Sequence, residues 1–158
     1  MPPKLDRADR TLLSALQQDA RLTVAALAER ARLSTSPTWR RIKRLEDEGV
    51  IAGYQAVLDR RAMGWSVLAF IQVTIEDHSE EQARAFEEAV FAVPEIIACW
   101  SVAGSADFLL QVVAQDLDAY ADFAMQRVRR MPGIKAMQTM FTLKEVKPVQ
   151  PCPIPKDR

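Results

Sequence analysis

Apolar residues recur at helical spacing along the first fifty residues and predict three short helices. Asp6 is suited to cap the first helix and Thr23 the second, because their side chains can accept hydrogen bonds from free backbone N–H groups. The residues expected on the inner faces of these two helices are Leu5, Ala8, Leu12 and Leu16, followed by Val24, Leu27, Ala28 and Ala31. The pattern therefore predicts a small helical domain.

The third helix is expected to begin at an N-cap, Ser36, and to run to Glu48. Pro37 fits its first turn, where no N–H donor is needed, and Gly49 suits the left-handed position that follows a helix. The apolar residues expected to pack inward follow one another at three-residue steps: Trp39, Ile42 and Leu45.

Basic residues occupy much of the rest of this third helix. Arg40, Arg41 and Arg44 are expected to point outward, with Lys43 on the flank. Two helices joined by a short turn, the second presenting basic residues, are typical of the helix-turn-helix, whose second helix enters the major groove of DNA. A merely solvated charged face is the alternative that this pattern leaves open. The extended pattern at 50–58 predicts either a wing or a strand that leads onward.

From residue 62 the pattern changes to alternating strands and helices. Strands are expected at 65–75, 96–102, 108–114 and 137–143. Ser79 opens one intervening helix through a capping box, and Asp116 caps the other. Pro94 and Pro132 occupy matching joints, so that strand–helix–strand occurs twice. This split repeat predicts an α+β, ferredoxin-like βαββαβ domain, with both helices on one face of a four-stranded antiparallel sheet.

The first of these strands is apolar on both sides. Its two faces hold Val67, Ala69, Ile71 and Val73 on one side, and Leu68 and Phe70 on the other. A sheet covered by helices on one face needs only that face to be apolar. We therefore expect the second face to pack against the same face of a second copy, which makes a dimer.

The charge of the chain is unevenly distributed. Its 158 residues include 21 basic and 21 acidic ones, so the net charge is zero. However, residues 1–61 hold 12 basic and 8 acidic residues, and the remainder has the opposite excess. Six basic residues and no acid lie from Arg30 to Arg44. The distribution favours a nucleic-acid partner for the first half alone.

Other functional classes find little support in the residues present. No apolar run approaches the ~18 residues of a membrane span, and the polar start shows no signal peptide. Cys99 and Cys152 lie far apart, and His78 is the single histidine, so metal sites and catalytic triads lack their usual residues. We expect a cytoplasmic protein that has no membrane partner, metal, cofactor or catalytic activity.

One turn of the second half has the chemistry of a ligand site. The segment Gly104-Ser105-Ala106-Asp107 joins two adjacent strands. Its backbone N–H groups suit a carboxylate and Asp107 suits an ammonium group, which together describe an amino acid. An ordinary hairpin turn that is favoured by aspartate is the alternative interpretation.

Several stretches, in order along the chain, resemble the Lrp/AsnC (leucine-responsive/asparagine, or feast/famine) transcriptional regulators. They are LDRAD at 5–9, LSTSPTWRRIKRLE at 33–46, GVIAGY at 49–54, GSADFLL at 104–110, MPGI at 131–134 and FTLKEVK at 141–147. The resemblance implies a winged helix-turn-helix over 1–61, a ferredoxin-like effector-binding and oligomerisation domain (RAM or ACT-like) over 62–147, and a proline-rich tail, 148–158.

The same resemblance implies the partners. They are double-stranded DNA, a second copy bound through the C-terminal sheets, further copies in tetramers or octamers, and an amino acid or related metabolite as effector. The protein would regulate transcription in the cytoplasm, associated with the nucleoid.

The resemblance also assigns residues. The recognition helix would be 36–48, and the DNA contacts would come from Ser36, Pro37, Thr38, Arg40, Arg41, Lys43 and Arg44. The effector contacts would come from Gly104, Ser105, Asp107 and Thr139.

Three positions depart from the family pattern. Ser105 replaces an acid of the effector loop and Ala106 a frequently aromatic residue. Arg32 stands where a glycine is usual, and a left-handed backbone there would cost about 1 kcal/mol. The loop departures favour one alternative, a DNA-binding architectural protein that uses no ligand. A dimeric ferredoxin-like enzyme is the remaining alternative, and the lone histidine argues against it.

Overall fold

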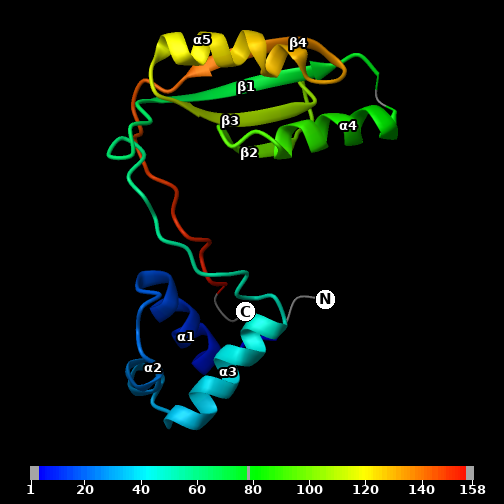
Figure 1. Cartoon of the computed structure of the whole chain (residues 1–158). Helices are drawn as coiled ribbons and strands as arrows, with labels where there is room; N and C mark the ends of the chain where they lie inside the picture. Colours follow the sequence, from blue (N-terminus) through cyan, green and yellow to red (C-terminus); the bar gives the residue numbers. More distant parts are fainter. Residues whose placement is uncertain (1–3, 78, 156–158) are drawn as a thin grey trace. The chain divides into compact units, whose positions relative to one another are not determined.

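The computed structural model describes residues 4–77 and 79–155, which form two compact units. Residues 1–57 and the tail 148–158 make the first unit, and residues 58–147 make the second (Figure 1). The tail thus groups with the N-terminal helices rather than forming a separate arm. His78 lies outside the described residues. No described helix is long and apolar enough to cross a membrane.

The first unit contains helices α1 (Arg7–Gln18), α2 (Val24–Ala31) and α3 (Thr35–Asp47). Asp6 and Asp9 form a reciprocal capping box at the start of α1, and the Thr23 side chain accepts a hydrogen bond from the Ala26 N–H at the start of α2. Arg32 ends α2 in the left-handed conformation (φ 55°), and Gly49 follows α3 at φ 70°. These caps and turns confirm the predicted helices and the strained arginine.

Helix α3 begins earlier than predicted. Its N-cap is Ser34, which makes no side-chain capping bond, so the assignment of Ser36 as the N-cap is wrong. Ser36 and Pro37 lie inside the first turn. That turn's N–H groups have no partner within the helix, so a proline costs no helical hydrogen bond there. Ser36 therefore has a helical backbone, although the residue before a proline usually prefers an extended one.

The buried face of α3 differs from the predicted one. Thr38 and Leu45 are fully buried, whereas Trp39 is 57% exposed, so the prediction that Trp39 packs inward is wrong. Thr38 tolerates burial because its hydroxyl donates a hydrogen bond to the Ser34 carbonyl at 2.9 Å. The unit's core centres on Leu12, Ala15 and Leu27, with Leu16, Leu22, Ala31 and Ile42 packed around them.

The second unit has the predicted ferredoxin-like topology. Its strands are β1 (Val67–Ile75), β2 (Ile96–Ser101), β3 (Phe108–Ala114) and β4 (Ile134–Phe141), all antiparallel in the order β2-β3-β1-β4. The helices are α4 (Glu80–Phe91) and α5 (Leu117–Gln126), followed by the 3₁₀ turn η1 (Val128–Arg130). One core joins α4, α5 and the same face of β1 and β3, through Phe86, Tyr120, Ile71 and Leu110 among others. Both helices therefore cover one face.

The opposite sheet face carries no charged residue at its paired positions. Residues directly opposite each other on neighbouring strands share a face, so the pairing register defines it. Its members are Leu68, Phe70, Gln72 and Thr74 on β1, Leu109, Gln111 and Val113 on β3, Ala136, Gln138 and Met140 on β4, and Ala98 and Trp100 on β2. Trp100 and Met140 are 46% and 43% exposed there. We call this surface the open sheet face.

The extended segment 50–58 forms no strand. It leads onward to the second unit without regular secondary structure, so the expected strand is not formed.

Candidate DNA-binding surface and effector loop

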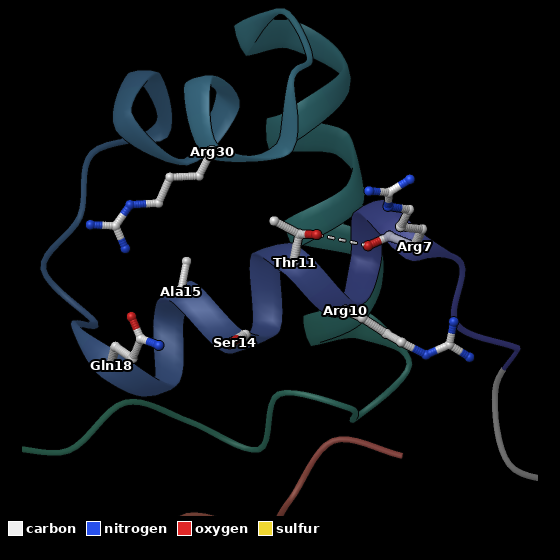
Figure 2. A pocket seen from close by; sticks show the side chains of 7 residues that line it. All are labelled: Arg7, Arg10, Thr11, Ser14, Ala15, Gln18 and Arg30. Atoms are coloured by element: carbon white, nitrogen blue, oxygen red, sulfur yellow. Dashed lines mark hydrogen bonds between the residues drawn. The ribbon is translucent and has the colours of Figure 1, made fainter. Parts of the chain in front are cut away.

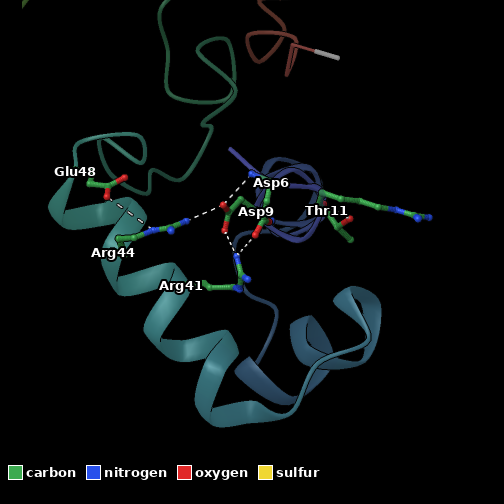
Figure 3. Close-up of polar contacts among 7 residues, drawn as sticks. Asp6, Asp9, Thr11, Arg41, Arg44 and Glu48 are labelled. Carbon is green, nitrogen blue, oxygen red and sulfur yellow. Dashed lines mark hydrogen bonds and ion pairs between the residues drawn. The ribbon is translucent and has the colours of Figure 1, made fainter. Parts of the chain in front are cut away.

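A buried carboxylate joins α1 to α3. Asp9 is 1% exposed, and its two side-chain oxygens accept hydrogen bonds from Arg41 at 2.8 Å and from Arg44 at 2.7 Å. Arg41 also contacts Asp6 at 2.6 Å, and Arg44 lies 3.9 Å from Glu48 (Figure 3). We call Asp6, Asp9, Arg41 and Arg44 the helix clamp. It fixes α3 against α1 through charge-assisted bonds.

The electrostatics of the clamp agree with its geometry. The Asp9 backbone N–H, and then the Arg41 guanidinium, hold the pKa of the Asp6 carboxyl below its ordinary value. Hydrogen bonds to Asp6 and Asp9 raise the pKa of Arg41 above its ordinary value. Both shifts favour the charged forms of Asp6 and Arg41 at neutral pH.

The structure divides the predicted DNA contacts into four groups. Thr38 is completely buried and its hydroxyl donates to the Ser34 carbonyl, so the structure does not support its predicted DNA contact. Arg41 and Arg44 are engaged by the clamp rather than simply directed outward. Ser36, Arg40 and Lys43 are exposed, and Lys43 makes an exposed ion pair with Asp47 at 2.9 Å. Pro37 lines a shallow hollow of about 290 Å³ together with Arg40, Arg41 and Arg44.

The exposed face of α3 follows from helical spacing. Positions 36, 39 or 40, and 43 succeed one another every three or four residues, so they share a face. Ser36, Arg40 and Lys43 lie on this face and Trp39 at its edge. We call these four residues the recognition face.

A second basic surface lies between α1 and α2. A groove of about 470 Å³ is lined by Arg7, Arg10 and Arg30 together with Thr11, Ser14, Ala15 and Gln18, and among the described residues no acidic one lines it (Figure 2). The Thr11 hydroxyl donates a hydrogen bond to the Arg7 carbonyl at 2.9 Å. The groove adds to the positive charge of this unit.

The tail is attached to α1 by side-chain hydrogen bonds. Arg10 donates from Nε to the Pro155 carbonyl at 3.1 Å, and Gln17 donates to the Cys152 carbonyl at 2.9 Å. Arg10 therefore lines the groove and also binds the tail. The chain returns to the first unit after completing the second.

The loop before β3 is a hairpin turn anchored by an aspartate. Asp107 accepts a hydrogen bond from the Ile75 N–H at 2.9 Å through its carboxylate. Its backbone N–H donates to the Val73 carbonyl and its carbonyl accepts from the Val102 N–H, each at 2.9 Å. Gly104 has φ 136°, in a region that favours glycine, and both Gly104 and Ser105 are exposed.

Thr139 lies apart from this loop within the single chain. It pairs with Ile71, whereas Asp107 bonds to Ile75, four residues or about 13 Å further along β1. The Thr139 hydroxyl forms a hydrogen bond with that of Tyr120. Burial raises the pKa of this tyrosine, and the Thr139 contact partly offsets the shift. Among the residues described, no group of three or more His, Cys, Asp or Glu is arranged to hold a metal.

Both units match known domain families. The Lrp/AsnC ligand binding domain matches residues 68–151, and a winged helix-turn-helix DNA-binding domain matches residues 5–52. The chain belongs to the Lrp/AsnC family. The DNA-binding transcriptional activator DecR of Escherichia coli K12 is 37% identical over 150 residues, covering 95% of this chain and 99% of DecR.

Solved structures of Lrp/AsnC regulators superpose along nearly the whole chain. A Neisseria meningitidis transcriptional regulator, solved with L-Met, has a TM-score of 0.90 at 35% identity and covers 95% of this chain and 97% of its own. An AsnC family regulator from Agrobacterium tumefaciens has a TM-score of 0.88 at 35% identity, covering 94% and 97%. The predicted fold class and family are confirmed.

Sequence reasoning missed two residues of the first unit. The sequence pattern assigns Asp9 no role of its own, and it wrongly predicts that Trp39 packs inward. The i,i+3 pair Asp6–Asp9 matches the i,i+3 pair Arg41–Arg44 in spacing and opposite charge. That match is the signal that could have indicated the clamp.

Proposed function

We propose that this protein is a sequence-specific transcriptional regulator whose α3 enters the major groove of DNA. The exposed recognition face carries the proposal, because it presents Arg40, Lys43 and Ser36 while the clamp holds the helix from behind. Arg40 reads a base edge, since a guanidinium can form two hydrogen bonds with guanine. Ser36 and Pro37 approach the backbone at the leading end of the helix. Arg41 and Arg44 position α3.

Removal of the two exposed cations should weaken DNA binding. For a duplex enriched by the full-length protein from a random-sequence pool, Arg40→Ala with Lys43→Ala should lower affinity at least tenfold. The dependence of log affinity on log salt should become shallower by about 1, since a phosphate contact contributes about 0.9 and Arg40 is proposed to contact a base rather than a phosphate. A phosphate contact made by Arg40 as well would raise this change in slope to about 2. The measurement is a titration by fluorescence anisotropy between about 50 and 200 mM salt.

The matched control removes the same charge elsewhere. Arg129→Ala with Arg130→Ala alters two exposed arginines of η1 in the second unit, and should leave affinity within about twofold. Equal losses for the two double variants would contradict a role for the recognition face. If the affinity of the unmodified protein for the duplex did not depend on salt, the proposal that it binds DNA would be contradicted.

We further propose that an amino acid or related metabolite binds at the hairpin loop and controls the regulator. Gly104, Ser105 and Asp107 would hold its charged ends, and the relative solved with L-Met supports this ligand class. Thr139 lies away from the loop in one chain, so it would contribute from another copy. The DNA-binding architectural protein without a ligand remains the competing hypothesis.

A thermal-shift screen of the twenty amino acids distinguishes these hypotheses. At a hundredfold excess over Kd a ligand adds about 2.7 kcal/mol to the stability of the form that it binds. Asp107→Asn should abolish that shift, because the amide oxygen can still accept from the Ile75 N–H while the charge is lost. Asp118→Asn, an exposed change on α5, should leave it intact. A screen without any shift would favour the architectural protein.

We also propose that two copies dimerise through the open sheet face, in the cytoplasm and associated with the nucleoid. The uncharged composition of that face supports this, because an isolated sheet normally turns polar and charged side chains to water. Assembly into tetramers or octamers would then bring several recognition helices to one stretch of DNA.

A further inference from the structure

Trp39 is an exposed tryptophan on the helix proposed to read DNA. It is 57% exposed, although it is the largest apolar side chain of α3. Exposed indole surface remains in contact with water at a cost of about 25 cal/mol per Å², so a partner that covers it gains affinity. No aromatic or cation–π contact involving Trp39 is found among the described residues.

The neighbours of Trp39 indicate what covers it. Ser36 and Lys43 are one helical turn before and after it, and Arg40 follows it directly. The two remaining arginines, Arg41 and Arg44, are engaged by the clamp. The recognition face therefore consists of two cations, a hydroxyl and an indole, and its charge suits a polyanion.

We propose that Trp39 is a specificity-determining residue that packs against the C5-methyl group of a thymine in the major groove. This inference rests on the proposed function of α3. The thymine methyl is the apolar group that the major-groove edges of the base pairs present, and it distinguishes thymine from every other base. The indole offers a broad apolar surface with little loss of rotamer freedom, because only two side-chain torsions must be fixed.

Replacing thymine by uracil removes only this methyl group and so tests the contact. The probe is the duplex that the full-length protein enriches from a random-sequence pool, with each thymine replaced in turn by deoxyuridine. One thymine per half-site should prove sensitive, with affinity falling about fourfold for each buried methyl group. Trp39→Ala should bind the thymine duplex correspondingly more weakly and should no longer distinguish it from the uracil duplex.

Two variants separate this contact from general damage to the helix. Trp39→Phe should retain part of the thymine preference, because a smaller aromatic ring still covers the methyl group. Arg40→Ala should weaken binding to both duplexes and preserve their ratio. Circular dichroism should show the same helix content for each variant.

The outcomes separate this inference from the proposed function. A protein that enriches no duplex contradicts both. A protein that enriches a duplex, but whose Trp39→Ala variant keeps the full preference for thymine over uracil, contradicts only the role of Trp39. If no uracil replacement lowered the affinity of the unmodified protein, the proposed role of Trp39 would likewise be contradicted.

Discussion

Asp9→Asn is expected to destabilise the helical unit by about 2–3 kcal/mol, a large effect for an isosteric change. Its buried carboxylate accepts bonds from Arg41 and Arg44, and a hydrogen bond to a charged group contributes about 1.5–3 kcal/mol. We do not expect the sum of the two hydrogen-bond contributions. The Arg41 and Arg44 side chains are 29% and 44% exposed, so they regain hydrogen bonds to water when Asp9 no longer binds them. The amide also presents an N–H group toward guanidinium donors.

Native-state hydrogen exchange of the full-length protein measures this effect where it occurs. Protection of the amides in α1 and α3 should fall together, because the clamp joins these two helices, while β1 and β3 should keep theirs. Asp47→Asn makes the same chemical change at an exposed pair with Lys43, and should leave the protection of the α1 and α3 amides close to that of the unmodified protein. Similar losses in the two variants would show that Asp9 is no more important than a surface ion pair.

Local chemistry predicted much of the fold. Asp6 and Thr23 cap their helices because a side-chain acceptor next to a helix start acts within three residues. Arg32 takes the left-handed conformation because the turn between α2 and α3 requires it, whatever the side chain. The repeated strand–helix–strand pattern led to the observed sheet order because few connections are compatible with it.

Contacts within the folded unit explain the features that the sequence pattern did not predict. Spacing alone allows Trp39 or Thr38 to accompany Leu45 on the buried face of α3, and hydrophobicity favours the wrong one. Thr38 is buried because its own helix satisfies its hydroxyl, a condition that no hydropathy pattern records. Similarly, Arg41 and Arg44 are basic residues on a DNA-binding helix, and only contact with α1 distinguishes them from Arg40.

The effector loop shows a second limit on what the sequence of one chain can predict. Its hairpin form was foreseeable from Gly104 and Asp107, and the structure contains that hairpin. However, Thr139 and the loop belong to separate parts of one chain, so a site that uses both requires a second copy. Single-chain sequence patterns carry little information on which residues meet across an interface.

Phe70→Glu should convert the proposed dimer into a monomer, with the dimer Kd weakened by at least a thousandfold. Phe70 lies opposite Met140 on one side and Gln111 on the other, inside the open sheet face. A glutamate there would be removed from water in the dimer without a charged partner, and the twofold axis would introduce it twice. Two such penalties readily exceed the about 4 kcal/mol that a thousandfold change represents.

Phe91→Glu provides the matched control for this change. Phe91 is 91% exposed at the end of α4, on the helix side of the sheet, so the same substitution should leave the dimer intact. Analytical ultracentrifugation at micromolar protein distinguishes the two masses, and circular dichroism checks that both variants remain folded. Dissociation by Phe91→Glu with an intact Phe70→Glu dimer would place the interface on the helices. The recognition helices would then be paired by a different symmetry, with a different spacing between DNA half-sites.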